Sequence, residues 1–180
     1  IDAAVIRVPH ISNFTDFGML EGCEEVSVRY VRTAGELGNP DLLLLPGSKN
    51  TMADLLWMRE NGLEARIQKL AVSGCRIMGI CGGYQMLGNR LEDPDGVEHG
   101  GQMAGLGLLP VVTRFRGSKH RTRVEGKVKK LSGVFEQMSG AGAEGYEIHM
   151  GETTADGGCD YFADVTDCVT GQRYADGAVK

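Results

Sequence analysis

The chain has 180 residues, of which 42% are hydrophobic and 24% are charged, a composition typical of a globular domain with a real core. The formal net charge is −5 and no basic patch stands out, which argues against a nucleic-acid-binding protein. No stretch of about 18 apolar residues occurs, so no membrane-spanning helix is expected. The five cysteines form no Cys-x-x-Cys pair, so we expect no metal site, no disulfide framework and a reducing, cytoplasmic location.

The first half of the chain alternates between strand and helix patterns. Four segments have the length and apolar pattern of strands: residues 3–8, 26–31, 42–45 and 76–80. Two segments have the apolar spacing of helices: residues 51–61 and 63–72. Within the second strand, Val26, Val28 and Tyr30 are expected to face one side. The third is apolar throughout and ends at Pro-Gly, which is typical of a strand buried on both faces of a parallel sheet.

The second half has a different pattern, with short strands between glycine-rich turns. Four segments are predicted strands: residues 111–115, 122–128, 144–149 and 168–174. The polar segments 91–101 and 138–143 are predicted loops. The whole pattern predicts an α/β fold, with a doubly wound, mostly parallel open sheet, helices on both faces and additional antiparallel strands in the second half. No internal repeat or linker is visible, so one domain is expected over residues 1–180.

The segment around Cys81 carries the chemistry. A predicted strand leads into a turn at Cys81, a short helix begins near Gly83, and Gly79 and Gly83 flank the cysteine two residues away on each side. This is the pattern of a nucleophile elbow, with Cys in place of Ser. A helix N-terminus lowers a thiol pKa, and the Gly82 N–H can donate to an oxyanion. Spacing alone leaves a small buried cysteine in a glycine-rich turn about as well supported.

The residues on either side favour the catalytic interpretation. Residues 79–88, Gly-Ile-Cys-Gly-Gly-Tyr-Gln-Met-Leu-Gly, resemble the nucleophile motif of the cobyric acid synthase branch of class I, triad-type glutamine amidotransferases. Further stretches resemble the same family in order and type: residues 7–17, 45–51, 105–110 and 145–151. The resemblance covers most of the chain. It implies a C-terminal domain that releases ammonia from glutamine for the ATP-dependent amidation of corrin carboxylates in cobalamin biosynthesis.

The resemblance also implies roles for five residues. Cys81 would attack the side-chain amide of glutamine and form a γ-glutamyl thioester. The backbone N–H groups of Gly47 and Gly82 would form the oxyanion hole, because the turn at Gly47 closes the neighbouring strand at the carboxyl edge of the sheet. Tyr84 and Gln85 would shape the substrate pocket in the first turn after the nucleophile. For Tyr84, a packing role is equally open.

A catalytic thiolate needs a histidine partner, and the chain has four histidines. His10 is expected in a loop, and His99 and His120 are expected to be solvated. His149 alternates with Glu147 on a predicted strand, so the two should share one side, at an edge that faces a partner or a substrate. We do not assign His149 as the base, because in the resembled family the catalytic histidine follows later. The base is therefore expected beyond the last residue, and the chain alone is expected to hydrolyse glutamine poorly.

The resemblance further implies a second domain. The chain has no initiator methionine and no signal peptide, so we expect it to be part of a longer protein, truncated at the C-terminus of this domain. An N-terminal synthase domain would bind ATP and magnesium and bring the corrin substrate, while this domain would bind glutamine and need no cofactor. No Gly-x-x-x-x-Gly-Lys-Ser/Thr phosphate loop occurs here, which agrees with that division.

Three details leave alternatives open. Glu152 stands where the resembled family tends to have arginine, which argues against an anion site there. Arg114 and Arg116 are either contacts for the glutamine carboxylate or exposed strand residues. The function itself has two alternatives: an amidotransferase of the cobyrinic acid a,c-diamide synthase or lipid II amidation type, and a non-catalytic scaffold for a partner synthetase.

Overall fold

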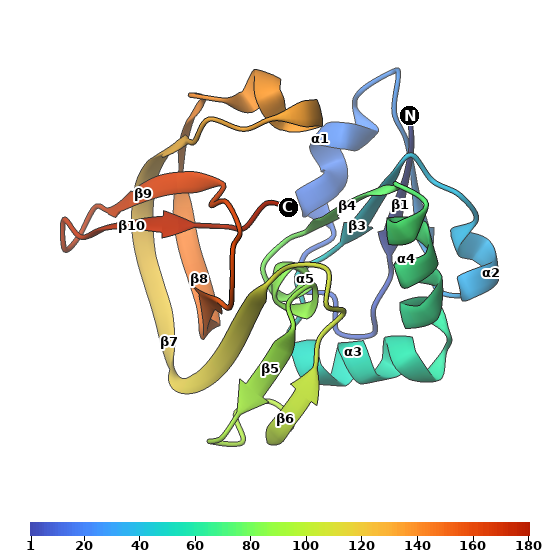
Figure 1. Ribbon diagram of the computed structural model, residues 1–180, viewed down its shortest axis with the longest axis horizontal. Helices are drawn as coiled ribbons and strands as arrows, with labels where there is room; N and C mark the ends of the chain where they lie inside the picture. The colour runs from blue at the N-terminus through green and yellow to red at the C-terminus, as the bar shows by residue number, and fades with distance from the viewer.

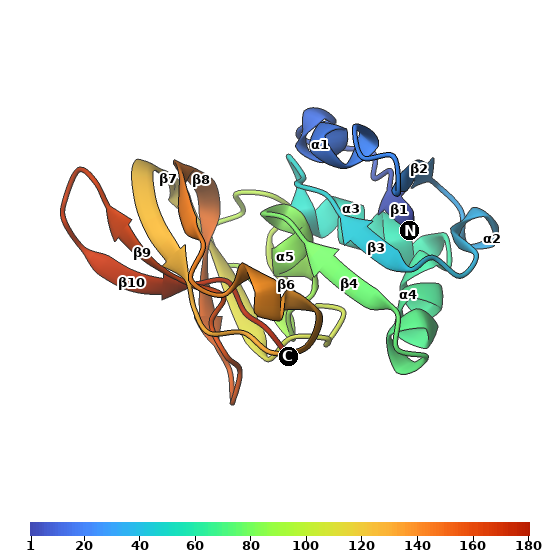
Figure 2. The same cartoon turned by 90° about the horizontal axis from the view of Figure 1, so that it is seen from above.

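The fold is built on two sheets that lie beside each other with α5 between them (Figures 1 and 2). The computed structural model describes the backbone of residues 1–180 and every side chain except those of Ser118, Lys119 and Val134. None of the helices in the described chain combines the length and the apolar character needed to cross a bilayer.

The first sheet is entirely parallel, with the strand order β2-β1-β3-β4. Its strands are β1 Asp2–Ile6, β2 Ser27–Val31, β3 Leu42–Leu45 and β4 Arg76–Gly79. The central strands β1 and β3 are almost wholly buried, as expected of apolar strands with both faces covered. The four predicted strands are therefore confirmed, although β1 ends two residues early, where Val8 bonds back to the Ile6 carbonyl.

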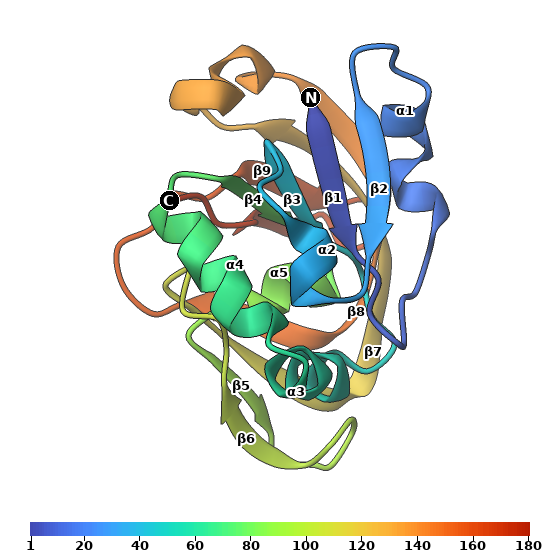
Figure 3. The ribbon, with the colours of Figure 1, turned by 90° about the vertical axis from the view of Figure 1, so that its right-hand side faces the viewer.

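Helices cover both faces of this parallel sheet, as predicted. The helices of this half are η1 Thr15–Phe17, α1 Gly18–Glu21, α2 Ala34–Leu37, α3 Thr51–Glu60, α4 Leu63–Val72 and α5 Gly82–Met86. One core lies between the sheet and α2, α3, α4 and α5, and a smaller core joins η1 and α1 to the other face. Figure 3 shows α2 and α4 in front of the strands. The predicted common side of β2 is confirmed, since Val26, Val28 and Tyr30 all pack into the smaller core.

The second sheet is mixed and is organised by one long strand, β7. Its strands are β5 Arg90–Asp93, β6 Gly101–Ala104, β7 Val111–Val128, β8 Gly142–Ala155, β9 Ala163–Asp167 and β10 Arg173–Asp176, and η2 Gly133–Met138 precedes β8. β8 pairs antiparallel along one edge of β7, while β5 and β9 share the other edge. The predicted strands at 111–115 and 122–128 are thus two parts of one strand, with a register shift between Phe115 and His120. β8 extends beyond the predicted 144–149 at both ends and takes in the end of the predicted loop at 138–143.

Two sequence predictions are wrong in part in this sheet. The segment 91–101 was predicted as a loop, which holds for residues 94–100, but residues 91–93 lie in β5 and Gly101 begins β6. Leu91 is fully buried in the main core, and the Asp93 carboxylate accepts backbone hydrogen bonds from the loop that follows it. The segment 168–174 was predicted as a strand, but most of it is the β9–β10 turn. Asp167 closes that turn by accepting the backbone N–H groups of the two residues after Cys168.

Candidate active site

Cys81 occupies a sharp, strained turn between β4 and α5. Its backbone dihedrals are φ 51° and ψ −111°, and it is the one non-glycine residue with positive φ in the described chain. The turn is held by hydrogen bonds from the Gly83 N–H to the Ile80 carbonyl (2.9 Å) and from the Gln85 N–H to the Cys81 carbonyl (3.0 Å). Such a conformation costs on the order of 1–3 kcal/mol and persists where surrounding packing imposes it. The elbow predicted from the sequence is therefore present.

The glycines beside Cys81 are required by close backbone contacts. A Cβ on Gly79 would lie 2.5 Å from the Gly83 carbonyl carbon, and a Cβ on Gly83 would overlap the Leu45 carbonyl oxygen. The helix α5 therefore packs directly onto the backbone of β3 and β4. This explains the Gly-x-Cys-x-Gly spacing by contact between chain segments, since neither glycine has a positive φ.

The turn after β3 lies against the elbow. The position of a Cβ on Gly47 is 3.7 Å from the Cys81 Cβ, and that of a Cβ on Gly82 is 2.9 Å from the Ser48 nitrogen. The Gly82 N–H lies close enough to the Cys81 sulfur to act on the pKa of the thiol, which it lowers. In the described chain, the Gly47 N–H makes no hydrogen bond to another residue. Cys81, Gly47 and Gly82 are thus brought together.

The environment of the thiol differs from the sequence expectation. Burial raises the pKa of Cys81 above its ordinary value, because surrounding protein desolvates the thiolate even though the residue reaches solvent. The Gly82 N–H acts in the opposite direction, while the negative charges of Asp16 and Glu98 raise the pKa further. The expected lowering by the helix N-terminus is therefore outweighed. α5 has only five residues, so its dipole is small.

The two predicted pocket residues have different surroundings. Tyr84 lines the cavity that also contains Cys81, and burial raises its pKa, with a further contribution from Asp176. Gln85 is buried and is not among the described residues that line this cavity. Its side-chain oxygen accepts a hydrogen bond from the Thr51 hydroxyl at 3.3 Å, so it links α5 to the start of α3.

The cavity at Cys81 has a volume of about 630 Å³ and a largely apolar wall. Its walls are β4, α5, the segment 107–109, two aromatic residues from the second half and the segment 176–180. Among its described lining residues there is no histidine. The groups present can therefore bind and orient a substrate, but none of them is a histidine placed to accept the thiol proton.

The four histidines lie in three places outside the cavity lining. His99 is exposed, and its backbone N–H bonds to Asp93. The expected common side of His149 and Glu147 is confirmed, since His149 Nε2 lies 2.5 Å from Glu147 Oε1. This hydrogen bond raises the pKa of His149 and lowers the pKa of Glu147. His120, half exposed, is 3.9 Å from the same carboxylate.

His10 is more than the loop residue expected from the sequence. Its ring Nδ1 donates to Asp54 at 2.8 Å, and Asp54 is fully buried on α3. Asp54 and Glu98 are two residues near the elbow that sequence reasoning missed. Glu98 accepts the Met52 N–H at 2.9 Å, and burial raises its pKa. No sequence signal identifies either residue, because each reaches the site only through the tertiary fold.

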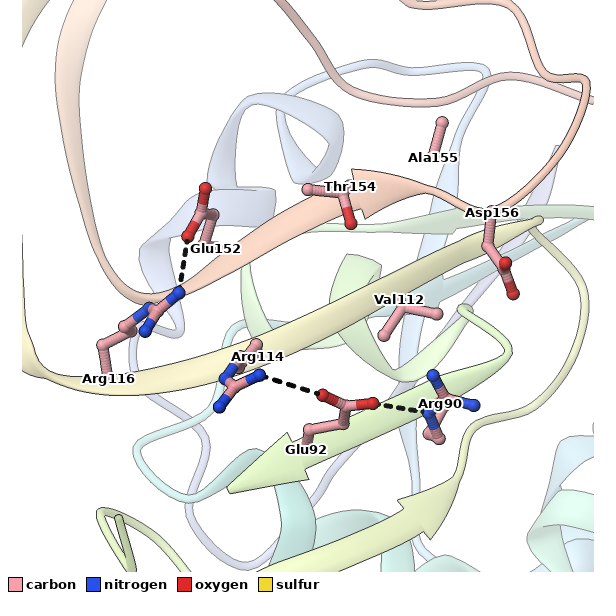
Figure 4. A pocket seen from close by; sticks show the side chains of 9 residues that line it. All are labelled: Arg90, Glu92, Val112, Arg114, Arg116, Glu152, Thr154, Ala155 and Asp156. Carbon is pink, nitrogen blue, oxygen red and sulfur yellow. Dashed lines mark hydrogen bonds and ion pairs between the residues drawn. The ribbon is translucent and has the colours of Figure 1, made fainter. Parts of the chain in front are cut away.

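A second hollow of about 380 Å³ lies on the outer face of the second sheet (Figure 4). Arg114 and Arg116 point into this hollow, where Arg114 pairs with Glu92 at 3.9 Å and Arg116 with Glu152 at 3.5 Å. Neither arginine is among the described residues that line the Cys81 cavity, so both correspond to the exposed-strand interpretation. No group of three or more metal-ligating side chains occurs in the part of the chain whose side chains are described.

Comparison with known proteins gives consistent results. A model of the CobB/CobQ-like glutamine amidotransferase domain matches residues 2–180. A cobyric acid synthase of Ruminiclostridium cellulolyticum is 60% identical over 158 residues, covering 88% of this chain and 31% of the relative. One from Moorella thermoacetica is 52% identical over 152 residues, covering 84% of this chain and 29% of the relative. The chain thus spans less than a third of the length of these relatives.

Solved structures agree on the fold. A structure described as a glutamine amidotransferase has a TM-score of 0.65 at 18% identity, covering 92% of this chain and 84% of the other. The structure of PurLQS from Thermotoga maritima has a TM-score of 0.64, also at 18% identity, covering 96% of this chain and 84% of the other. At this identity the similarity establishes the fold alone.

Proposed function

Because the chain belongs to the CobB/CobQ-like glutamine amidotransferase domain family, we propose that it releases ammonia from glutamine with Cys81 as the nucleophile. One observation carries the assignment to Cys81. Its strained backbone presents the thiol to a 630 Å³ cavity, directly beside the backbone of Gly47 and Gly82. A buried structural cysteine would need neither the strain nor the adjoining turn.

The chemistry follows from these groups. The Cys81 sulfur attacks the amide carbon of the glutamine side chain, and the new oxyanion accepts hydrogen bonds from the Gly47 and Gly82 N–H groups. The carbon–nitrogen bond then breaks. The nitrogen leaves as ammonia with the proton that a base took from the thiol, and a γ-glutamyl thioester remains. Water hydrolyses the thioester to glutamate and restores the thiol.

The base is proposed to come from chain beyond residue 180. Two observations support this: the described residues lining the cavity include no histidine, and burial raises the thiol pKa, so the proton must be removed by a partner. A histidine beside the thiol would reverse that shift, because an imidazolium stabilises the thiolate. Residues 1–180 are therefore proposed to be an amidotransferase domain that lacks its base.

The ammonia is proposed to serve the amidation of corrin carboxylates. The matched part of this chain covers only 31% and 29% of the named cobyric acid synthases, which leaves room for an N-terminal synthase domain. That domain would bind ATP and magnesium and would be the partner of this one. We also propose that the protein acts in the reducing cytoplasm, where cysteines such as these five remain unpaired.

The test compares two proteins: the chain as given, and the chain extended by about 50 residues, roughly the remainder of a domain of ordinary size. Glutamate formation from glutamine is measured for both, and for Cys81→Ser in the extended form. We expect activity in the extended form only, and its loss in Cys81→Ser. Activity that survives Cys81→Ser would refute the nucleophile, and full activity of the short chain would refute the missing base.

A further inference from the structure

A buried carboxylate on α3 holds together the two loops beside the nucleophile. The Asp54 side chain is fully buried. One of its oxygens accepts the Ser48 hydroxyl at 2.6 Å, and the other accepts the His10 ring Nδ1–H at 2.8 Å and the His10 backbone N–H at 3.1 Å. The carboxylate thus has three donors, one from the turn after β3 and two from the loop after β1.

The same two loops are also joined directly on both sides of Ser48. The Ser12 N–H donates to the Gly47 carbonyl at 2.9 Å, and the Lys49 N–H donates to the His10 carbonyl at 2.8 Å. Residues 11 and 48 form an antiparallel bridge. A Cβ on Gly47 would overlap the Ser12 hydroxyl, so the two loops are in van der Waals contact at this point. Asp54 therefore anchors a short two-stranded clamp, formed by residues 10–12 and 47–49, with Gly47 at one end.

This clamp lies against the nucleophile. The Gly47 Cβ position is 3.7 Å from the Cys81 Cβ, and the Ser48 nitrogen is 2.9 Å from the Gly82 Cβ position. A shift of the clamp by about 1 Å would change the direction of the Gly47 N–H relative to the thiol, and displacements of that size cost up to about 100-fold in rate.

The choice of residues is hard to explain by stability alone. Burying the Asp54 carboxylate costs free energy because it must be removed from water, and its hydrogen bonds offset a cost that an apolar side chain of the same volume would not have. His10 also leaves about half of its side chain exposed, at 51%, so it contributes little to the core. A carboxylate that receives donors from two loops does, however, define one arrangement of those loops.

We propose that Asp54 and His10 are positioning residues that hold the Gly47 N–H in place to receive the oxyanion during glutamine hydrolysis. Asp54 acts through Ser48 and His10, and none of the three needs to touch the reacting atoms. The proposal rests on the proposed function, since it presumes that Gly47 stabilises the oxyanion formed at Cys81.

The test uses the extended protein in which Cys81-dependent hydrolysis is measured. His10→Leu removes the ring donor to Asp54, whereas His10→Asn keeps an N–H donor close to the position of Nδ1. Asp54→Asn keeps the volume but removes the charge, and Asp164→Asn, on an exposed position of β9, is the matched control. For each variant, kcat and KM for glutamine are measured together with the rate at which iodoacetamide alkylates Cys81, a displacement that forms no oxyanion.

For His10→Leu and Asp54→Asn we expect kcat to fall by about 10- to 100-fold, with KM within about twofold and an unchanged alkylation rate. We expect His10→Asn to recover most of the lost kcat and Asp164→Asn to match the unaltered protein. Unchanged kcat in His10→Leu and Asp54→Asn would overturn the proposal. A parallel fall in alkylation would also overturn it, because the thiol itself would then have moved. Absence of Cys81-dependent hydrolysis in the unaltered protein would instead refute the proposed function.

Discussion

Replacing Gly83 by alanine tests whether α5 is held by direct backbone contact with β3. A Cβ at this position would overlap the Leu45 carbonyl oxygen and would lie 2.8 Å from the Leu45 Cβ, closer than the 3.0 Å that real Cβ atoms respect. Leu45 cannot move away, because β3 is paired with β1 on one side and β4 on the other. Its carbonyl also accepts the Ile80 N–H at 3.0 Å. The helix must therefore shift, and Cys81 with it.

The magnitude follows from two opposing effects. Overpacking in a well-packed region costs about 1–3 kcal/mol, whereas alanine in place of glycine in a helix gains about 0.5–1 kcal/mol. The net expectation is a loss of about 1–2 kcal/mol. For a chain of this size that corresponds to a decrease in Tm of roughly 2–8 °C. Displacement of the thiol should also lower kcat by about tenfold or more in the form that hydrolyses glutamine.

The assay is thermal unfolding of Gly83→Ala beside Gly35→Ala. Gly35 also lies in a helix, α2, with a negative φ, but a Cβ there meets nothing within 4 Å. Gly35→Ala should therefore keep its Tm or raise it slightly. A Gly83→Ala protein that melts at or above the temperature of the unaltered chain would refute the contact argument, as would equal decreases in both variants.

Three further predictions concern charged and titratable groups. The hydrogen bond between Glu147 and His149 lowers the pKa of the first and raises the pKa of the second. Its contribution to stability is therefore present between the ordinary values of 4.5 and 6.5, and is lost as pH rises through the folded pKa of His149 or falls through that of Glu147. His149→Gln should lower Tm most within that window, and a pH-independent difference would contradict this. The pH dependence of Cys81 alkylation should have its midpoint above pH 9.0 in this chain, and Glu98→Gln should move that midpoint to lower pH. An unchanged midpoint would show that the charge of Glu98 does not act on the thiol. Asp93→Asn should cost about 1–3 kcal/mol in urea unfolding, because an amide N–H group replaces one oxygen that accepts buried backbone N–H donors.

The elbow could be predicted from the sequence because its determinants are local. Gly79, Cys81 and Gly83 lie within five positions, and the strand before them and the helix after them are written in the same short segment. The direction of the thiol pKa could not be predicted. It depends on Asp16 and Glu98, which are distant in sequence, and on how much protein surrounds the sulfur.

The second half shows the limit of local patterns more clearly. β7 pairs with β5, β8 and β9, and no pattern within its own residues specifies three partners. The error at 168–174 arose because β-branched and apolar residues there resemble a strand, while hydrogen bonds to Asp167 make a turn. The error at 91–101 arose because Leu91 is one buried residue in a polar segment.

The sequence by itself determined the parallel half of the fold, the elbow at Cys81 and the family, because apolar period, glycine spacing and motif order are all properties of neighbouring residues. Only the tertiary structure decided that Gly47 lies against Cys81, that Gln85 is buried outside the cavity lining, and that Asp54 joins two loops. Those contacts bring together residues tens of positions apart. Their formation depends on how strands and helices pack as a whole, which no local pattern encodes.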